Sequence, residues 1–396
     1  MRIALVTDTY LPRVNGVVNS VRTFAGEFRA RGHEVVILAP SFPKYTDDED
    51  GIWRVPSHFL VFDPEDRLAN PGHPRGRRLL KDLADWRPDV VHTQTPFTLG
   101  LAATGWWRKQ LNAPLVHTYH TFFEAYAHHY LPLLGKRLGR RLAAAYSKWF
   151  CNRQDLVIVP SSPIEEALRG YGVTRPIAVN PTGILLEPFA GIDGARMRRQ
   201  LGFHPDESML LTMGRVAHEK NLPFLLDVLP RVADSRPKVR LVIAGRGPAL
   251  ESIKQEVTRR GLGARVVFIG YLDRRDWADL YAAADLHVLA SLTETQGMVL
   301  TEAMAAGTPC VAVAAMGVKD VMAGGGGLTV PPDRQTFAEA VLRLLGDREL
   351  YAAKVAEAGR QARQWSSGAM AEKLLQRYQA LIQGASHVTQ RGDKIR

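Results

Sequence analysis

The 396-residue chain contains only two cysteines, Cys151 and Cys310. Two cysteines are too few for the disulfide framework of a small secreted protein or for a zinc site built from thiolates. The count is typical of a protein that works in a reducing cytoplasm. The sequence therefore predicts a fold that depends on its hydrophobic core, and a cytoplasmic location.

The chain also lacks a hydrophobic run that could cross a bilayer. Its longest stretch without a charged residue, Val90–Trp107, is interrupted by His92, Gln94 and several threonines, whereas a membrane-spanning helix needs about 20 mostly apolar residues. The first residues, Met1–Asp8, turn polar after a short apolar run, which predicts a β-strand and not a signal peptide. We therefore expect no membrane-spanning segment.

Two ligand-binding motifs are missing. The Gly-x-Gly-x-x-Gly fingerprint of NAD-binding domains is absent after the first predicted strand, where Thr7-Asp8-Thr9-Tyr10 stands instead. The stretch Gly245–Pro248 is too short to replace it. The acidic run Asp47–Asp50 is predicted to be a solvated loop, and no Asp-x-Asp motif stands in a loop positioned to bind a ligand. The sequence thus predicts neither an NAD-dependent enzyme nor a tight metal site.

Positive charge, in contrast, is plentiful. The net charge is +11, and between Arg75 and Arg153 there are 13 lysines and arginines against four acidic residues. Most of the excess therefore lies in one segment of the first half. Such a segment predicts contact with a polyanionic surface, either nucleic acid or anionic lipid.

Short apolar runs alternate with helical stretches along both halves of the chain. The predicted strands lie at residues 3–6, 35–39, 90–92, 115–118 and 156–160, and then at 209–213, 241–244, 266–269, 286–290 and 309–312. Helices are predicted over residues 17–31, 222–233, 249–260 and 276–283. This alternation predicts parallel sheets covered on both faces. The fold class is therefore α/β, with two Rossmann-like, doubly wound parallel-sheet domains.

The length of the chain is sufficient for two domains. Their predicted joint is the loop Asn180–Gly183, which is followed by a poorly periodic stretch. We expect one domain over residues 1–180 and a second over residues 195–367. A C-terminal helix over residues 368–384 is expected to pack back on the first domain, and the polar residues beyond it are expected to be disordered.

Two glutamates eight residues apart, Glu294 and Glu302, flank a glycine turn that follows a predicted strand and begins a helix. Backbone N–H groups at a helix start can hold an anion or sugar hydroxyls. In this sequence those groups would belong to Gly297, Met298, Val299 and Leu300. The carboxylates would accept hydrogen bonds from hydroxyl groups. Taken alone, the pattern fits a loop acid and a helix-surface acid equally well.

A second polar motif, Gly214-Arg215 with Lys220, also follows a predicted strand and precedes a helix. Cations at this place can form a phosphate clamp, although solvated basic residues are common in loops. Both motifs follow strands of the same predicted sheet. Because ligands of open α/β sheets bind beyond the carboxyl ends of the strands, the pair of motifs predicts one ligand site.

The combination of Gly-Arg-x4-Lys and Glu-x7-Glu resembles retaining glycosyltransferase family 4. The resemblance covers nearly the whole chain and implies the GT-B fold, in which two Rossmann-like domains face a central cleft. It implies that Arg215 and Lys220 neutralise the diphosphate of a nucleotide-sugar and stabilise the leaving group. It also implies that Glu302 binds the ribose hydroxyls and that Glu294 binds a hydroxyl of the donor sugar.

Four further positions belong to the expected donor site. Gly16 lies in a turn that leads into a helix, where a glycine allows close approach of a bound diphosphate or sugar. His120 lies just past a strand, and in similar enzymes the histidine here contacts the donor sugar, although a structural role is commoner for a single histidine. Tyr271 and Leu272 match the family segment that packs on the base.

The segment over residues 118–132 resembles that of the bacterial diacylglycerol glucosyltransferases within this family. A helix with basic and apolar side chains follows it, and such a helix can dock on anionic head groups. The membrane-facing residues are predicted to be Lys136, Arg137, Arg140, Arg141, Lys148 and Trp149, with Leu138, Leu142, Tyr146 and Phe150 on the apolar side. Trp106–Lys109 and Arg75–Arg78 could add to this face. The alternative is a basic helix with an ordinary core face.

The resemblance implies an enzyme that transfers a hexose with retention, from UDP-glucose or a related UDP-hexose to a lipid, diacylglycerol. We expect it to act as a peripheral protein on the inner face of the cell membrane, with no tightly bound cofactor and with divalent metal only as a stimulant. A different acceptor remains an alternative, either a phosphoinositide mannosylated from GDP-mannose or a soluble molecule. A nucleic-acid-binding protein is a further alternative, but the basic residues are not interleaved with stacking aromatics, so no nucleic-acid partner is expected. The sequence does not determine the oligomeric state.

Overall fold

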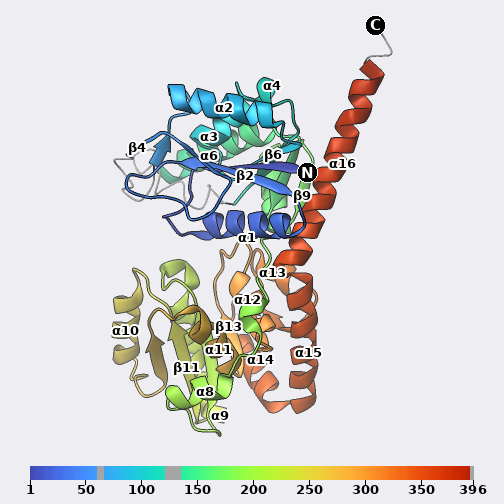
Figure 1. The fold of residues 1–396 in the computed structure, drawn as a ribbon. Helices are drawn as coiled ribbons and strands as arrows, with labels where there is room; N and C mark the ends of the chain where they lie inside the picture. Colours follow the sequence, from blue (N-terminus) through green and yellow to red (C-terminus); the bar gives the residue numbers. More distant parts are fainter. Residues whose placement is uncertain (60–66, 121–134, 393–396) are drawn as a thin grey trace. The chain divides into compact units, whose positions relative to one another are not determined.

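The computed structural model describes residues 1–59, 67–120 and 135–392. The chain forms two compact α/β units (Figure 1). The N-terminal unit comprises Met1–Thr182 and Met370–Arg396, and the C-terminal unit comprises Gly183–Ala369. Each unit is built on a parallel sheet, so the predicted α/β class with two Rossmann-like domains is confirmed.

The N-terminal unit contains a seven-stranded parallel sheet. In spatial order its strands are β3 (Ile52–Val55), β2 (Glu34–Pro40), β1 (Arg2–Val6), β6 (Val90–Thr93), β7 (Leu115–Thr118), β8 (Leu156–Val159) and β9 (Ile177–Val179). A separate antiparallel pair is formed by β4 (Ser57–Phe59) and β5 (Arg67–Ala69). The helices are α1 (Gly16–Ala30), α2 (Pro74–Trp86), α3 (Thr98–Thr104), α4 (Arg108–Leu111), α6 (Gly135–Cys151), α7 (Ser162–Gly170) and α16 (Ser367–Gly392).

The C-terminal unit contains a six-stranded parallel sheet. In spatial order its strands are β12 (Val266–Ile269), β11 (Val239–Ala244), β10 (Ser208–Met213), β13 (Leu286–Leu289), β14 (Cys310–Val313) and β15 (Gly327–Val330). The α-helices are α8 (Gly194–Gln200), α9 (Leu222–Ser235), α10 (Leu250–Arg259), α11 (Arg274–Ala283), α12 (Met298–Ala305), α13 (Val318–Met322), α14 (Arg334–Gly346) and α15 (Arg348–Gln364). Two short 3₁₀ helices are η2 (Glu187–Phe189) and η3 (His218–Lys220).

The central strands are mostly apolar because helices cover both faces of each sheet. In β10, Leu210 packs into one hydrophobic cluster with α9 and α14, while Leu211 packs into a second cluster with α11 and α12. The same alternation continues in β11. These two cores hold the loops at the ends of the strands in fixed positions.

The C-terminal helix α16 returns to the N-terminal unit. Its Tyr378 is fully buried, with its ring 5.9 Å from that of Phe28 in α1 and its hydroxyl bonded to His92 of β6. The helix extends to Gly392, past the point near Gly384 where the sequence predicted disorder. The N-terminal core is therefore completed by residues from the far end of the chain.

The spatial order of the strands reverses once in each sheet, between β1 and β6 and between β10 and β13. Loops on the two sides of such a reversal diverge and leave a crevice beyond the carboxyl ends of the strands, where open α/β sheets bind their ligands. His120 and Gly16 lie at this edge of the N-terminal sheet. Lys220 and Glu294 lie at the equivalent edge of the C-terminal sheet.

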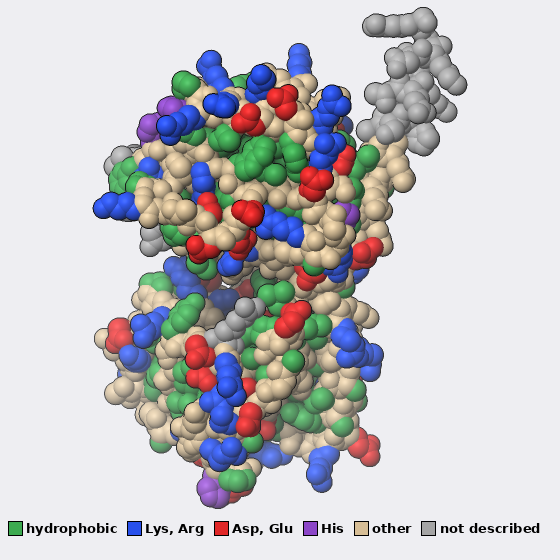
Figure 2. All heavy atoms as spheres, viewed as in Figure 1, with side chains coloured by type: hydrophobic (Ala, Val, Ile, Leu, Met, Phe, Trp, Pro, Cys, Tyr) green, Lys and Arg blue, Asp and Glu red, His purple; other side chains and the backbone are tan. Residues whose placement is uncertain are grey.

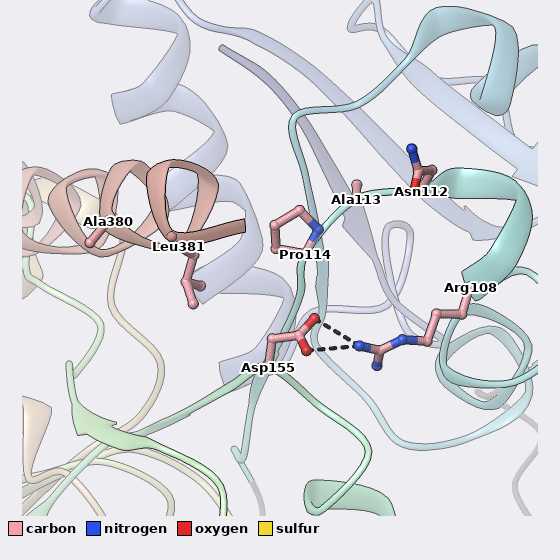
Figure 3. A pocket seen from close by; sticks show the side chains of 8 residues that line it. Arg108, Asn112, Ala113, Pro114, Asp155, Ala380 and Leu381 are labelled. Atoms are coloured by element: carbon pink, nitrogen blue, oxygen red, sulfur yellow. Dashed lines mark hydrogen bonds and ion pairs between the residues drawn. The ribbon is translucent and has the colours of Figure 1, made fainter. Parts of the chain in front are cut away.

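A pocket at the opposite edge of the N-terminal sheet has a volume of about 530 Å³ (Figure 3). It is lined by Pro114 and Asp155, which precede two strands, and by Leu381 of α16. Its charged groups satisfy each other, because Arg108 Nη2 donates to both carboxylate oxygens of Asp155 at 2.7 and 3.0 Å. The two charged side chains that line this pocket are therefore paired with each other.

In the acidic run Asp47–Asp50, the last three residues are exposed, as the sequence predicted, but Asp47 is not solvated. Asp47 is largely buried and forms an ion pair with Arg54, whose Nη2 also donates to the Leu11 carbonyl at 2.8 Å. Glu49 lies within ion-pair distance of Arg29. Arg54 thus ties this segment to the loop that follows β1.

Candidate active site

Lys220 connects the two polar motifs of the C-terminal unit. Its ammonium group forms a largely buried ion pair with Glu294. Lys220 comes from η3 after β10, and Glu294 comes from the loop after β13, so neighbouring strands bring them together. A Cβ atom on Gly214 would lie 3.9 Å from both Lys220 Cε and Val299 Cγ1. The Gly-Arg-x4-Lys loop therefore lies against the start of α12.

The loop that follows β10 requires close backbone packing. Gly245 has φ of +134°, and a Cβ atom there would lie only 1.9 Å from the carbonyl oxygen of Gly214. Only glycine allows this approach. The neighbouring loops after β10 and β11 are consequently held together through their backbones, which fixes the position of the residues that follow Gly214.

The turn before α12 presents backbone amides. Gly297 has φ of +76°, in the left-handed region that favours glycine. Within the described part of the chain, the amides of Met298 and Val299 have no hydrogen-bond acceptor. The Leu300 amide differs from the prediction, because it donates to the Gly297 carbonyl at 2.9 Å. Fewer amides are therefore unbonded at this helix start than the sequence indicated.

Glu302 lies in the first turns of α12 with its carboxylate surrounded by protein. The Tyr281 hydroxyl donates to Glu302 Oε2 at 2.8 Å. Burial raises the pKa of Glu302 to about 7, while the hydrogen bond from Tyr281 and the charge of Lys220 act in the opposite direction. Lys220 is thus close enough to interact with both glutamates of the Glu-x7-Glu motif.

Two other predicted residues of the C-terminal unit make no such contacts. Arg215 is exposed and has no partner among the residues that the structure describes. Tyr271 follows the edge strand β12, and its side chain is 85% exposed. Leu272 packs partly against the core formed with α11. The side chains of Arg215 and Tyr271 are therefore free to contact a ligand, and the structure does not bring them into contact with Lys220 or Glu294.

Asp8 organises the carboxyl edge of the N-terminal sheet. It follows β1 and accepts hydrogen bonds from Thr95 Oγ1 at 2.8 Å, Thr98 Oγ1 at 2.6 Å and the Leu99 amide at 2.8 Å. These donors belong to the loop after β6 and the start of α3. Burial raises the pKa of Asp8, and the hydrogen bonds oppose this effect. Asp8 therefore fixes the loops beside His120 instead of facing a ligand with an unpaired carboxylate.

Within residues 1–59, 67–120 and 135–392, His120 makes one polar contact, with Gln94. Its Nε2 lies 2.8 Å from Gln94 Oε1. Because an amide oxygen can only accept, Nε2 carries the proton and Nδ1 is left as an acceptor. Burial lowers the pKa of His120 to about 4. At neutral pH the residue is therefore an uncharged imidazole that can accept a hydrogen bond from a hydroxyl group.

Gly16 is the first residue of α1, which Asn15 caps through a bond from the Val18 amide to Asn15 Oδ1 at 3.0 Å. No described residue would lie within 4 Å of a Cβ atom at Gly16. The backbone does not need a glycine for its own conformation here. Among the described residues, the space beside Gly16 is therefore open, and its contact with a ligand stays a prediction.

The basic helix α6 exposes both charge and apolar surface. Leu138, Leu142 and Trp149 are 48%, 44% and 43% exposed. Arg137, Arg140 and Arg141 are exposed and line a shallow hollow of about 410 Å³. Lys148 is also exposed, and its Nζ lies against Gly172. Figure 2 shows further basic side chains over helix α2, which carries Arg75–Arg78.

Three residues expected on this face are buried or engaged in the structure. Phe150 and Trp107 lie in the core because they pack against the sheet, and the Tyr146 hydroxyl bonds to the Pro96 carbonyl. The segment 121–134, which carries the likeness to diacylglycerol glucosyltransferases, lies outside the described residues. Of Lys136 only the backbone is described. No helix in the described ranges is long and apolar enough to cross a membrane.

Sequence analysis missed three residues that shape these sites: Asp8, Gln94 and Tyr281. Asp8 and Gln94 each follow a predicted strand, and a polar residue at that position is a signal that could have found them. Tyr281 gives no such signal, since it lies within a helix that packs on the core. No cluster of three or more metal-binding side chains occurs in the part of the chain that is described.

Two family models match the chain and together span most of it. The model described as Glycosyltransferase Family 4 matches residues 14–187, and the model described as Glycosyl transferases group 1 matches residues 193–364. The first match contains Gly16 and His120, and the second contains all four residues of the polar motifs after β10 and β13.

Curated relatives include glycosyltransferases of two kinds. The chain is 34% identical to the alpha-monoglucosyldiacylglycerol synthase of Streptococcus pneumoniae over 79% of this chain and 71% of that protein. It is 30% identical to the GDP-mannose-dependent alpha-mannosyltransferase of Mycolicibacterium smegmatis over 96% of this chain and 98% of that protein.

The same fold occurs in the crystal structure of Anabaena HepE in complex with UDP. That structure has a TM-score of 0.75 and 19% sequence identity, and the match covers 96% of this chain and 100% of that one. It supports the GT-B class of two parallel-sheet units. On these matches, the chain belongs to glycosyltransferase family 4.

Proposed function

We propose that the enzyme transfers a hexose from a UDP-sugar, UDP-glucose or a close relative, to diacylglycerol. The observation that carries the donor site is the ion pair of Lys220 with Glu294 beside the free amides of α12. A cation next to backbone amides suits a diphosphate, and carboxylates suit sugar hydroxyls. We place the donor in the C-terminal unit, with Arg215 and Lys220 on the diphosphate and Tyr271 and Leu272 on the base.

Glu294 would accept a hydrogen bond from a hydroxyl of the donor sugar, and Glu302 would accept from the ribose. The bond between the anomeric carbon and the diphosphate oxygen breaks as the acceptor oxygen attacks from the same face. The departing phosphate oxygen takes the acceptor proton, so the anomeric configuration is retained. Lys220 and Arg215 lower the energy of this step by neutralising the charge that develops on the diphosphate.

The acceptor would be delivered by the N-terminal unit. His120 offers a neutral acceptor atom, Nδ1, to a hydroxyl of the donor sugar, and Gly16 leaves the start of α1 open to the diphosphate or sugar. The exposed arginines and apolar side chains of α6 suit a membrane surface, where arginine heads meet lipid phosphates and Trp149 enters the interface. The enzyme would thus work as a peripheral protein at the inner face of the cell membrane.

We propose no tightly bound cofactor and no nucleic-acid partner. Lys220 and Arg215 would neutralise the negative charge of the diphosphate, as a divalent cation does in many enzymes that act on phosphate groups. Added divalent metal would therefore stimulate only weakly, by screening the diphosphate in solution.

A second candidate is mannosyl transfer from GDP-mannose to a phosphoinositide or another acceptor. It is favoured by the match to a GDP-mannose-dependent alpha-mannosyltransferase, which extends over 96% of this chain. The sites described above serve this reaction equally well, because the diphosphate and ribose are common to both donors. The two candidates differ in the base, the sugar and the acceptor.

The test is a donor and acceptor panel with the full-length protein. Radiolabelled UDP-glucose, UDP-galactose, UDP-N-acetylglucosamine and GDP-mannose are each incubated with anionic vesicles that contain diacylglycerol, phosphatidylinositol or neither. The expected result is transfer of label from a UDP-hexose into the lipid phase only when diacylglycerol is present. The coupling constant of the anomeric proton in the product reports whether the configuration is retained.

Transfer from GDP-mannose with phosphatidylinositol vesicles would replace the first candidate by the second. Absence of label transfer with every donor and every vesicle would contradict both lipid assignments and favour a soluble acceptor.

A further inference from the structure

Tyr281 is joined to the candidate ribose ligand Glu302 by a direct bond. Its hydroxyl donates to Oε2 at 2.8 Å, and no other polar partner of this carboxylate occurs within residues 1–59, 67–120 and 135–392. A carboxylate has two oxygens, and this bond uses one of them. Oε1 is left to accept hydrogen bonds from a ligand.

The Tyr281 side chain is itself immobilised. It is fully buried, and its ring lies 5.7 Å from that of Trp277, 6.5 Å from that of Phe189 and 5.5 Å from that of His287. Its backbone carbonyl accepts a bond from Thr308 Oγ1 at 2.6 Å. The hydroxyl can therefore act as a fixed reference point for the carboxylate.

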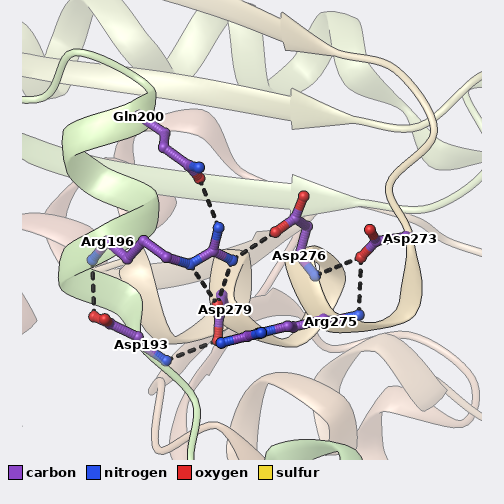
Figure 4. A network of polar contacts seen from close by, with 7 residues as sticks. All are labelled: Asp193, Arg196, Gln200, Asp273, Arg275, Asp276 and Asp279. Atoms are coloured by element: carbon purple, nitrogen blue, oxygen red, sulfur yellow. Dashed lines mark hydrogen bonds and ion pairs between the residues drawn. The ribbon is translucent and has the colours of Figure 1, made fainter.

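Helix α11, which carries Tyr281, is anchored to the core by a polar network (Figure 4). Arg196 reaches from α8 and places Nη2 at 2.5 Å from both Asp276 Oδ1 and Asp279 Oδ2. Asp279 also accepts from the Asp193 amide at 2.7 Å. Asp273 caps the start of α11 by accepting from the amides of the next turn.

We propose that Tyr281 is a positioning residue that orients the Glu302 carboxylate for the ribose hydroxyls of the nucleotide. This inference rests on the proposed function, in which Glu302 binds the ribose. Tyr281 acts through Glu302, since its buried hydroxyl is occupied by that bond. Without it, the carboxylate would rotate about its own side-chain bonds and present no fixed oxygen to the ligand.

The electrostatic setting supports the same role. Burial raises the pKa of Glu302 to about 7, and the bond from Tyr281 lowers it. The positive charge of Lys220, which pairs with Glu294, also lowers the pKa of Glu302. Removal of the Tyr281 hydroxyl therefore favours the protonated form of Glu302, which is a weaker acceptor.

The experiment compares ribose discrimination in the wild type and in Tyr281→Phe. The affinities of UDP and GDP are first measured by calorimetry at pH 8. The nucleotide that binds more tightly is then compared with its 2′-deoxy and 3′-deoxy analogues. A hydrogen bond to a charged group predicts that the wild type binds the ribonucleotide at least about tenfold tighter than the deoxy form. Tyr281→Phe should reduce this ratio to about threefold or less.

Two control variants separate positioning from folding and from the proposed function itself. Tyr351→Phe removes another partly buried hydroxyl of the same unit, which bonds to the Asp285 carbonyl at 3.0 Å, and should keep the wild-type ratio. Glu302→Gln should lower the ratio as Tyr281→Phe does. Because each ratio compares two ligands on one preparation, it is valid even if part of a variant is unfolded.

An unchanged ratio in Tyr281→Phe, with a lowered ratio in Glu302→Gln, would overturn the positioning role and leave the proposed function intact. A wild type that binds ribonucleotide and deoxynucleotide equally would contradict the assignment of Glu302 to the ribose, and the inference would fall with it. A second readout is the pH dependence of UDP or GDP affinity, whose midpoint should move to higher pH in Tyr281→Phe.

Discussion

At the scale of single residues, Lys220 is the group on which the C-terminal site depends. Its ammonium group forms an ion pair with Glu294, and its positive charge lowers the pKa of Glu302. One cation therefore acts on both acids of the Glu-x7-Glu motif. Arg215 differs, because it is exposed and unpaired in the described structure. The two cations should therefore respond differently to substitution.

Arg215→Ala should lower kcat by about 100-fold, because it removes a charge that stabilises the leaving diphosphate. Its unfolding free energy should change by less than about 0.5 kcal/mol, as is usual for an exposed residue. Lys220→Ala should lower kcat by about 100- to 1,000-fold, and it should also destabilise the fold by about 1–3 kcal/mol because Glu294 loses its partner.

These effects are measured by steady-state kinetics and urea unfolding. Lys254→Ala is the matched control, since Lys254 forms an exposed ion pair with Glu251 on the surface helix α10. Wild-type turnover in both Arg215→Ala and Lys220→Ala would refute their assignment to the diphosphate.

Glu302 should make the stability of the ligand-free protein depend on pH. Its pKa is about 7 in the folded protein and near 4.5 in the unfolded chain. Between these values the folded state holds a proton that the unfolded state has lost, so the unfolding free energy falls as pH rises from 4.5 to 7. The contribution is at most about 1.4 kcal/mol per pH unit and is constant above pH 7.

The measurement is urea unfolding at several pH values between 5 and 8.5, for the wild type and Glu302→Gln. The wild type should gain stability relative to the variant as pH falls through 7. If the difference in unfolding free energy between the wild type and Glu302→Gln stays constant over this pH range, the pKa of Glu302 is not raised in the folded protein.

At the scale of elements, helix α6 combines exposed arginines with exposed leucine and tryptophan side chains. Replacing Arg137, Arg140 and Arg141 together by alanine should weaken binding to anionic vesicles by about 100-fold, since each basic residue near such a surface contributes about 1 kcal/mol. Vesicle flotation at low and moderate salt measures the loss, and the salt dependence should become shallower.

The control variant replaces three exposed cations of the C-terminal unit, Arg231, Lys254 and Arg259, by alanine. Transfer to an acceptor in detergent micelles should be equal in both triple variants. If the α6 variant and the control float with vesicles as the wild type does, α6 is not the docking surface.

The elements also show what the sequence can and cannot determine. Central strands such as β1 and β10 are buried on both faces, and their continuous apolar runs predicted them correctly. The edge strands β3 and β9 were missed because they are short and partly exposed: an arginine interrupts the apolar residues of β3, and the apolar run of β9 is only three residues long. Likewise, motif spacing predicted that Lys220 and Glu294 lie at neighbouring strand ends, whereas the bond between Tyr281 and Glu302 depends on how two helices pack.

At the scale of the whole molecule, the N-terminal unit depends on the C-terminal helix. Tyr378 fills the space beside Phe28 and bonds to His92, whose other ring nitrogen bonds to Thr118 Oγ1 at 2.7 Å. Burial lowers the pKa of His92, so the imidazole is neutral and needs both partners. This chain of bonds ends two residues before His120.

Truncation after Ser366 should therefore unfold or destabilise the N-terminal unit, because it exposes the apolar surface that Tyr378 and Leu374 cover. Truncation after Gly384 keeps these contacts and should melt within a few degrees of the full-length protein. Tyr378→Phe tests the hydroxyl alone and should cost about 1–3 kcal/mol, since it leaves a buried ring nitrogen of His92 unpaired. Thermal melting followed by circular dichroism compares the two truncations and Tyr378→Phe with the full-length protein. An unaltered melting curve for the chain that ends at Ser366 would contradict this role of α16.

The return of α16 also affects the order in which the protein can be made. A ribosome synthesises residues 1–182 first, yet the last piece of that unit, which begins at Met370, is made only after the whole C-terminal unit. The first half must wait, with the surface around Phe28 uncovered, while the second half is translated and folds. The N-terminal unit is therefore completed only after residues 183–369 have been translated, and a nascent chain stalled before residue 370 would still expose the apolar surface around Phe28.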